Sequence, residues 1–155
     1  MNRVIIIFLT VLLASCIKED TTNYYAYLKN TTGHQIKIIP YFSGALVQAH
    51  IVTLSPNEKK EIANGSARGL QNNGGFSSPY FSGADSLVVI FDSLYSITHY
   101  GSLPATVSRK YYLYSSRRNL GNYLSYQLQA KDISAHMREN TYTFEFVEQD
   151  YLDSR

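Results

Sequence analysis

Alternation of apolar and polar residues predicts β-strands over most of the chain. The clearest alternation is in residues 141–146, where every second residue is aromatic, so one face of this strand must lie in the core. Residues 86–91 are the most apolar segment of the chain after residue 20 and predict a short buried strand. Asp92-Ser93 supplies turn chemistry, and residues 94–100 resume the strand pattern. We therefore expect a β-hairpin over residues 86–100.

A second hairpin is predicted near the start of the domain. Residues 24–29 and 34–42 are rich in β-branched and aromatic residues, and Asn30-Thr31-Thr32-Gly33 between them has the composition of a turn. Tyr25 and Tyr27 share one face of the first of these strands, and we expect them to pack in the core. The remaining predicted strands are residues 46–54, 58–63, 111–114 and 123–129.

One short helix and two long loops complete the predicted elements. Asp132 has a side chain suited to capping a helix over residues 133–139. Residues 120–128 fit helical spacing as well as strand spacing, and their tyrosine and glycine content favours the strand. The predicted loops cover residues 64–79 and 101–110, and a loop as long as the first is usually functional or mobile.

Together these elements predict an all-β fold. Many short strands joined by turns, with at most one short helix, are typical of an antiparallel β-sandwich, and a small closed β-barrel is the alternative. The sequence has no internal repeat of about 20–50 residues, which argues against a solenoid or a propeller. We expect a single domain over residues 24–151 and a carboxyl-terminal tail over residues 152–155.

The first residues have the pattern of a signal peptide. Arg3 gives a positive start, and residues 4–14 form an apolar run that Thr10 alone interrupts. This run is too short to cross a hydrocarbon core of about 30 Å as a stable helix. Residues 1–15 are therefore predicted to be a cleaved signal peptide.

The Leu13-Ala14-Ser15-Cys16 sequence resembles the lipobox of bacterial lipoproteins. The resemblance implies cleavage before Cys16 and attachment of acyl chains such as palmitate to this residue, which would anchor the protein to a membrane. Two or three acyl chains hold a protein far more firmly than one. Cys16 is also the only cysteine in the sequence, so the mature chain can form no disulfide within itself.

The residues after Cys16 resemble an export signal. Lys18-Glu19-Asp20 is similar to the short signal that sends lipoproteins of the Bacteroidota to the outer face of the outer membrane. We therefore expect a lipidated flexible tether over residues 16–23 and display at the cell surface. A lipoprotein on the periplasmic face is the alternative, because an ordinary solvated tether has the same composition.

Two further resemblances point to the same bacteria. Three Asp-Ser or Asp-Thr sequences resemble their O-glycosylation motif, and the implied acceptors are Thr21, Ser86 and Ser93. The lipobox, the polar tether, the central residues 85–92 and the closing residues 142–151 are together similar to small β-rich lipoproteins of the Bacteroidota. This similarity implies a fold and a location but carries no activity.

Composition and charge limit the partners. The 155-residue chain has a formal net charge of +2, so we expect no nucleic acid partner. Fourteen tyrosines suit a sheet-rich protein with wet surfaces. Basic pairs flank a tyrosine-rich run and predict a cationic, aromatic surface that could stack on sugar rings or hold anionic headgroups, with solvated strand ends as the alternative. The residues of this predicted surface are Arg109, Lys110, Tyr112, Tyr114, Arg117 and Arg118.

A search for catalytic motifs finds none. The histidines lack zinc-motif spacing, and the sequence has no P-loop, dinucleotide fingerprint or nucleophile elbow. His34, His50 and His99 fall in or beside predicted strands, where we expect partly exposed histidines. Asp85 and Asp92 lie at opposite ends of one strand, which does not suit a pair of glycosidase carboxylates. We therefore expect no cofactor, no metal ion and no enzymatic activity.

The predicted function is binding. The chain is expected to be a lipid-anchored module at the cell surface that interacts with a glycan or with an envelope or host protein. The alternative is an accessory subunit on the periplasmic face that docks through a strand edge. A tyrosine-lined groove would favour a glycan ligand, a bare strand edge would favour the accessory subunit, and a pocket with histidine and carboxylates would favour an enzyme.

Overall fold

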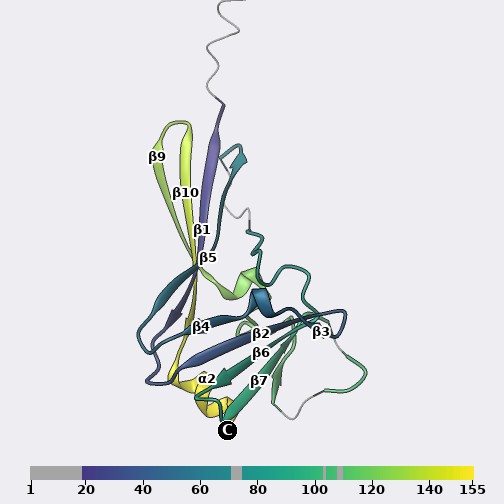
Figure 1. The fold of residues 1–155 in the computed structure, drawn as a ribbon. Coiled ribbons are helices and arrows are strands. Elements are labelled where there is room, and N and C mark those ends of the chain that lie inside the picture. Colours follow the sequence, from purple (N-terminus) through teal and green to yellow (C-terminus); the bar gives the residue numbers. More distant parts are fainter. Residues whose placement is uncertain (1–18, 71–74, 103, 108–109) are drawn as a thin grey trace, which may run out of the picture.

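The computed structural model describes residues 19–70, 75–102, 104–107 and 110–155 (Figure 1). Over these residues the chain forms two β-sheets that share one hydrophobic core, with one α-helix at the carboxyl end. The predicted β-sandwich is therefore confirmed, and the described strands do not close into a barrel. No described helix is long and apolar enough to cross a membrane.

The first sheet has four long strands in the order β5-β1-β10-β9. The central pair β1 and β10 runs parallel over ten residues, from Thr21 opposite Met137 to Asn30 opposite Phe146. The two outer pairs are antiparallel. The parallel pair brings the two ends of the domain side by side at the centre of the sheet (Figure 1). The strand bounds are β1 Thr21–Asn30, β5 Lys59–Arg68, β9 Gln127–Ser134 and β10 Met137–Phe146.

The second sheet has the order β3-β2-β6-β7-β8, and β4 also pairs with β2. Its central hairpin, β6 and β7, is the predicted one, and Asp92 and Ser93 turn the chain with φ angles of 50° and 61°. The pairs are antiparallel except for β7 with β8. The bounds are β2 Ile36–Phe42, β3 Ala45–Leu46, β4 Val52–Leu54, β6 Ser86–Phe91, β7 Tyr95–Tyr100 and β8 Tyr111–Tyr112, with a short 3-10 helix, η1, over Gln48–His50.

The predicted amino-terminal hairpin is wrong, because β1 and β2 belong to different sheets. Asn30, which is fully buried, redirects the chain between them. Its amide nitrogen donates to the carbonyls of His34 at 2.8 Å and Ser55 at 2.9 Å, and its amide oxygen accepts from the Thr32 backbone N–H at 3.0 Å. These bonds satisfy backbone groups that a tight hairpin would have paired with each other.

Alternation along the strands divides the core face from the outer face. Ala26 and Leu28 of β1 are fully buried between the sheets, whereas Tyr25 and Tyr27 lie on the outer face of the first sheet and are half-buried. The expectation that these two tyrosines pack in the core is therefore wrong by one register position. The buried apolar residues of the strands that build the core are Ala26, Leu28, Ile36, Ile38, Val52, Leu54, Ile62, Ala63, Leu87, Val89, Phe91, Ile97, Tyr142, Phe144 and Phe146.

The predicted helix over residues 133–139 is also wrong. These residues form the end of β9, the turn at Ala135-His136 and the start of β10, and the register shift between Met137 and Arg138 leaves Ile133 without a partner on β10. Ile133 is 48% exposed, so a helix here would have no core to cover. Asp132 pairs with Arg138 across the hairpin at 2.6 Å instead of capping a helix.

The folded domain is longer than predicted at both ends. Strand β1 begins at Thr21 and Thr22 is buried, so residues 21–23 of the expected tether belong to the sheet. At the other end, the helix α2 spans Glu148–Ser154 and includes most of the expected tail. Asp150 starts this helix, since its carboxylate accepts the Val147 backbone N–H at 2.9 Å.

Part of the first sheet projects beyond the second sheet (Figure 1). We call this part the arm; it comprises residues 21–25, 64–68 and 129–141. Seven of the eight residues of β9 are exposed, because no second sheet covers them. The described chain enters at the tip of the arm, where the Thr21 backbone N–H donates to the carbonyl of His136 at 2.9 Å and Asp20 pairs with the His136 ring at 2.7 Å.

Candidate functional site

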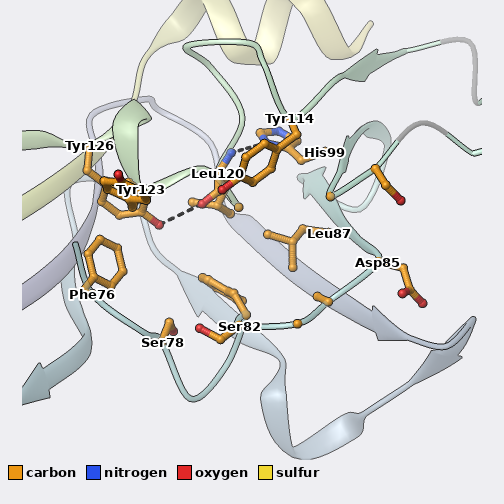
Figure 2. A pocket seen from close by; sticks show the side chains of 16 residues that line it. Phe76, Ser78, Ser82, Asp85, Leu87, His99, Tyr114, Leu120, Tyr123 and Tyr126 are labelled. Carbon is orange, nitrogen blue, oxygen red and sulfur yellow. Dashed lines mark hydrogen bonds between the residues drawn. The ribbon is translucent and has the colours of Figure 1, made fainter. Parts of the chain in front are cut away.

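A pocket of about 410 Å³ opens beside β6 and β7. Two irregular segments, residues 76–85 and 114–126, supply most of its walls, and Leu87 and His99 come from the two strands. Figure 2 shows Phe76, Tyr123 and Tyr126 gathered on one side and Ser78 and Ser82 along the lower rim. The aromatic residues that line the pocket are Phe76, Phe81, Tyr114, Tyr123 and Tyr126.

The first wall is held by a buried serine. The Ser78 hydroxyl donates to the carbonyl of Ile62 in β5 at 3.1 Å, and the carbonyl of Ser78 accepts the backbone N–H of Ser82 at 3.0 Å. Phe81, between them, is only 6% exposed and fills the core side of the wall. The Ser82 side chain is left at the pocket rim, where the Ser77 hydroxyl donates to it at 2.9 Å.

The second wall is fixed by two buried asparagines. Asn119, which is fully buried, donates to the carbonyls of Tyr100 at 2.9 Å and Tyr112 at 3.1 Å. Asn122 donates to the carbonyl of Tyr114 at 2.8 Å and accepts the Leu124 backbone N–H at 3.0 Å. This second bond caps the 3-10 helix η2, Tyr123–Ser125. Because both amides donate to and accept from backbone groups, they hold the wall in shape without a ligand.

His99 joins this wall to the second sheet. The residue is 3% exposed, and its Nδ1 accepts the Leu120 backbone N–H at 2.8 Å (Figure 2). Burial, with a smaller contribution from Arg118, lowers the pKa of His99 to about 3. The ring is therefore neutral at physiological pH, and since Nδ1 accepts, Nε2 carries the hydrogen. The expectation of a partly exposed histidine is wrong for His99, because the loop folds over it.

Asp85 and His99 line the same pocket, but their environments do not suit general base catalysis. The Asp85 carboxylate accepts the Gly44 backbone N–H at 2.9 Å. A histidine with a pKa of about 3 is a weak base near neutral pH. Within the described residues, no three side chains of His, Cys, Asp or Glu are placed to hold a metal ion.

The pocket is instead suited to binding a ligand with both polar and apolar faces. Tyr114 and Tyr123 are 45% and 40% exposed, so their rings are open to contact. Tyr126 is buried behind them, and its hydroxyl donates to the carbonyl of Leu120 at 3.1 Å. Burial raises the pKa of Tyr126, which keeps that hydroxyl neutral. Flat rings and the exposed serines Ser82 and Ser102 in one pocket offer stacking and hydrogen bonding at once.

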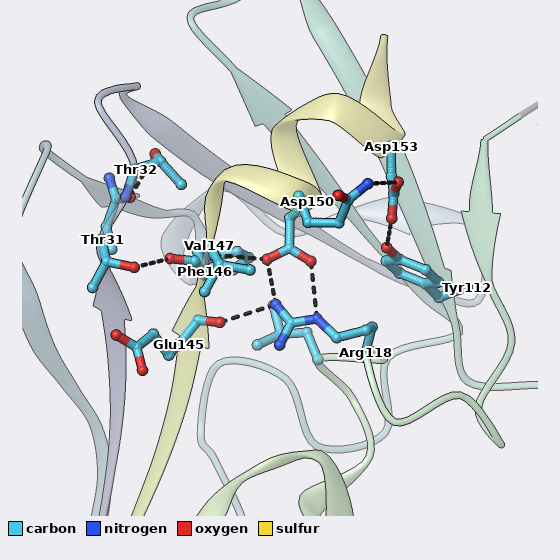
Figure 3. Close-up of polar contacts among 12 residues, drawn as sticks. Thr31, Thr32, Tyr112, Arg118, Glu145, Phe146, Val147, Asp150 and Asp153 are labelled. Atoms are coloured by element: carbon cyan, nitrogen blue, oxygen red, sulfur yellow. Dashed lines mark hydrogen bonds and ion pairs between the residues drawn. The ribbon is translucent and has the colours of Figure 1, made fainter.

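The predicted cationic, aromatic surface is dispersed in the structure. The Tyr112 hydroxyl donates to Asp153 at 2.5 Å (Figure 3). Lys110 donates to the carbonyl of Arg155, so both side chains hold the carboxyl-terminal helix. Of the described members of the predicted set, Tyr114 alone lines the pocket. Arg117 is exposed, and Arg109 lies outside the described residues.

Arg118, also of the predicted surface, has a structural role. Its guanidinium forms an ion pair with Asp150, donating to one carboxylate oxygen at 3.0 Å, and it donates to the carbonyl of Glu145 at 2.9 Å (Figure 3). It also lies over the Phe144 ring, 4.8 Å from the ring centre. Asp150 is 3% exposed, so the pair is buried on its acidic side. Arg118 is therefore committed to holding helix α2 on the sheets.

The predicted lipidation and export residues lie mainly at the edge of the described chain. Cys16 and Lys18 are outside the described residues. Glu19 is exposed and lies 3.4 Å from Arg68, and Asp20 pairs with His136.

The three predicted O-glycosylation acceptors differ in setting. Thr21 begins β1 and Ser86 begins β6, where both are paired within a sheet. Ser93 is exposed at the tip of the β6–β7 turn. Of the three, Ser93 is the most open to an enzyme.

Sequence reasoning did not identify Phe76, Tyr123 or the asparagines that fix the pocket. The Asn119-Leu120-Gly121-Asn122 sequence was the available signal, because asparagines that bond backbone groups two residues ahead mark turns rather than strands. Comparison with protein-family models, with curated proteins and with solved structures finds no match to the chain.

Proposed function

We propose that this chain is a lipid-anchored lipoprotein of the outer membrane, exposed at the cell surface, that binds a saccharide without catalysing a reaction on it. The observation that carries the proposal is the pocket, whose lining includes the exposed rings of Tyr114 and Tyr123 and the exposed serines Ser82 and Ser102. Sugar rings have apolar faces and hydroxyl edges, so both kinds of group are used in binding them.

The size and charge of the pocket limit the ligands that it can bind. A volume of about 410 Å³ lies in the lower part of the range for small-molecule sites. Among the described residues that line the pocket, Asp85 is the only acidic or basic side chain besides His99, and His99 is neutral. We therefore propose one or two units of a neutral sugar as the ligand.

The lipobox supports the anchoring part of the proposal. Acyl chains on Cys16 would hold the chain at the membrane, and few residues separate Cys16 from the start of β1 at Thr21. The arm would then lie next to the membrane, with the rest of the domain beyond it.

Saccharide binding is tested with the full-length chain and a panel of neutral sugars: galactose, mannose, fucose and N-acetylglucosamine. Titration calorimetry should find at least one binder, and Tyr123→Ala or Tyr114→Ala should weaken it about tenfold through loss of stacking. Tyr111→Ala is the matched control, because Tyr111 is also 40% exposed but lies outside the pocket. Equal losses in all three variants, or no binding of any sugar, would contradict the proposal.

Anchoring and display are tested separately. Palmitate labelling should be lost in Cys16→Ala, and protease added to intact cells should degrade the wild-type chain. Replacement of Lys18, Glu19 and Asp20 by alanine should protect the chain from the protease. A wild-type chain that resists the protease would favour the periplasmic face.

The edge of β9 favours a second candidate function, an accessory subunit of an envelope complex. β9 is the outermost strand of the first sheet, and no described strand pairs with its free edge. Its eight residues are long enough to accept a strand from a partner. A photo-crosslinker at Ala130 should then give a discrete product in intact cells, and a crosslinker at the exposed Thr53 of the second sheet should not.

A further inference from the structure

The outer face of the first sheet carries a second groove, unrelated to the pocket. It has a volume of about 250 Å³ and crosses all four strands. The residues that line it are Lys29, Lys59, Gln127, Gln129, Thr143 and Glu145. They occupy the face opposite to Leu28 and Phe144, which point into the core. The first sheet therefore separates this groove from the pocket beside β6 and β7.

Two lysines of the groove are direct cross-strand neighbours. Lys29 of β1 is opposite Lys59 of β5, and like charges at such positions destabilise a sheet. Glu145 pairs with Lys29 at 2.9 Å. The Lys59 ammonium lies over the Tyr27 ring, 4.1 Å from its centre. The lining therefore holds two ammonium groups and one carboxylate.

Another carboxylate, that of Glu61, lies two residues after Lys59 in β5 and already has a hydrogen-bond partner. Glu61, opposite Tyr27, accepts a hydrogen bond from the Asn64 amide at 2.5 Å. The stacking of Lys59 on Tyr27 also holds its ammonium at the groove. An excess positive charge is thus kept in place on the face of the sheet.

Neutral hydrogen-bonding groups lie beside this charge. Thr143 and Gln127 are opposite each other, and Thr141 and Gln129 form the next pair along the same face. In the described part of the chain, neither glutamine amide nor the Thr143 hydroxyl has a side-chain hydrogen bond. Amides that can donate and accept suit neighbouring hydroxyl groups of a sugar. Tyr25, half-buried in the adjacent row, offers a ring face.

We propose that this groove binds an acidic saccharide, a sugar unit with a carboxylate. The carboxylate would lie between Lys29 and Lys59, and the sugar hydroxyls would bond to Gln127, Gln129 and Thr143. Binding would relieve the repulsion between the two lysines. Because Glu145 already occupies one side of Lys29, it competes with the ligand carboxylate.

The probe for this site is trigalacturonate, with the neutral trisaccharide of galactose and sodium acetate as comparisons, titrated into the full-length chain. Trigalacturonate should bind, and Lys59→Met should weaken its binding about tenfold. Lys37→Met is the matched control, because Lys37 is an exposed lysine near the start of β2 on the other sheet. It should change the affinity less than about twofold.

A gain of affinity provides the sharper test. Glu145→Gln keeps the size of the side chain and removes the competing charge, so trigalacturonate should bind about threefold more tightly, and more so at low salt. The site is rejected if trigalacturonate does not bind, if acetate or the neutral trisaccharide binds equally well, or if Lys59→Met and Lys37→Met act alike. Tyr123→Ala should leave this binding unchanged, so failure here is distinguishable from failure of the pocket.

Discussion

At the level of single residues, buried polar side chains shape the pocket as much as the apolar core does. Asn119, Asn122 and His99 each bond to a backbone group of the loop that carries Tyr123. A loop without regular structure otherwise leaves its N–H and C=O groups unpaired when it is buried. These three side chains therefore let an irregular segment form a rigid wall, and tyrosine rings on it lose little freedom when a ligand binds.

Gly101 at the pocket rim should tolerate no larger residue. A Cβ there would lie 2.8 Å from the carbonyl oxygen of Ala84, which is backbone and is fixed by its neighbours, since Gly101 N–H itself bonds the Asp85 carbonyl at 2.8 Å. Gly101→Ala should lower the free energy of unfolding by about 1–3 kcal/mol in urea denaturation. The control is Gly33→Ala, where a Cβ meets nothing within 4 Å, and a change within about 0.5 kcal/mol is expected.

His34 should make stability depend on pH. Its ring stacks on Tyr151 at 3.6 Å between ring centres, its Nδ1 contacts Asp92 at 2.5 Å, and Glu148 lies 3.4 Å from Nε2. The hydrogen bond with Asp92 is the main cause that raises the pKa of His34. A raised pKa means that the folded state binds the proton more tightly, so the stabilisation is complete below about pH 6.5 and is lost as the pH rises through the folded value.

The His34–Asp92 contact also stabilises the fold through Asp92, and this part of the stabilisation depends on pH in the opposite direction. The bond to His34 lowers the pKa of Asp92, so its stabilisation is present above about pH 4 and is lost on further acidification. Because the pKa of His34 is raised, urea midpoints measured from pH 5 to pH 9 should fall in the wild type as the pH rises above about 6.5. His34→Gln should remove that fall, and His136→Gln, which alters a histidine at the tip of the arm, should keep it. An unchanged profile in His34→Gln would disprove this linkage.

At the level of elements, helix α2 closes one end of the sandwich. Its Tyr151 ring packs edge-on against Phe91 and Tyr95 of the second sheet, and its Asp150 binds Arg118, which also bonds the Glu145 carbonyl of the first sheet. Seven residues are too few for a helix that is stable alone. The helix therefore depends on these contacts, and both sheets gain a common cover from it.

Removing one member of the buried ion pair should be more damaging than removing both. Asp150→Ala leaves the Arg118 guanidinium unpaired and the Val147 N–H uncapped. It should lower the free energy of unfolding by about 2–4 kcal/mol, which is less than for a fully buried ion pair because the Arg118 side chain is 35% exposed. Arg118→Met with Asp150→Leu should recover part of that loss, since a packed apolar pair replaces the charges. Thermal unfolding monitored by circular dichroism measures both. A double variant less stable than Asp150→Ala would disprove this reasoning.

The elements that the sequence predicted correctly are those formed by neighbouring residues. The β6–β7 hairpin and the alternating strand ending at Phe146 depend on local patterns, and both are present. The parallel pairing of β1 with β10 joins the two ends of the domain, which no local pattern specifies. Helix α2 was missed because Tyr151 and Asp150 owe their burial to Phe91 and Arg118, residues remote in sequence.

The candidate site was predicted least well, for the same reason. Tyr114 was singled out for its neighbouring charges, yet the structure uses Arg118 to hold helix α2 and leaves Tyr114 to line a pocket with Phe76 and Tyr123. These three residues come from separate segments, and only the folded loops bring them together. The polar groove on the outer face was hidden by the one-position error in the register of β1, which placed Tyr25 and Tyr27 in the core.

At the level of the whole molecule, the arm sets the distance between the anchor and the opposite end of the domain. The chain enters the described structure at the tip of the arm, and β1 runs from there for ten residues, or about 33 Å, to Asn30 (Figure 1). The β6–β7 turn lies near that far end, because Asp92 contacts His34 just beyond β1. The Ala135-His136 turn lies at the near end, since the His136 carbonyl accepts the Thr21 N–H.

An acylated Cys16 should therefore hold Ala135 close to the bilayer and Ser93 far from it. With Cys16 acylated, a cysteine introduced at either position is the only free thiol and can carry a fluorophore. In vesicles with nitroxide headgroups, the label in Ala135→Cys should be strongly quenched and the label in Ser93→Cys should not, because about 33 Å of paired strands separates the two turns. The same labels on a chain with Cys16→Ala should show no quenching at either position. Equal quenching of both labels in the acylated chain would mean that the domain lies flat on the membrane, and the arm would then not act as a stalk.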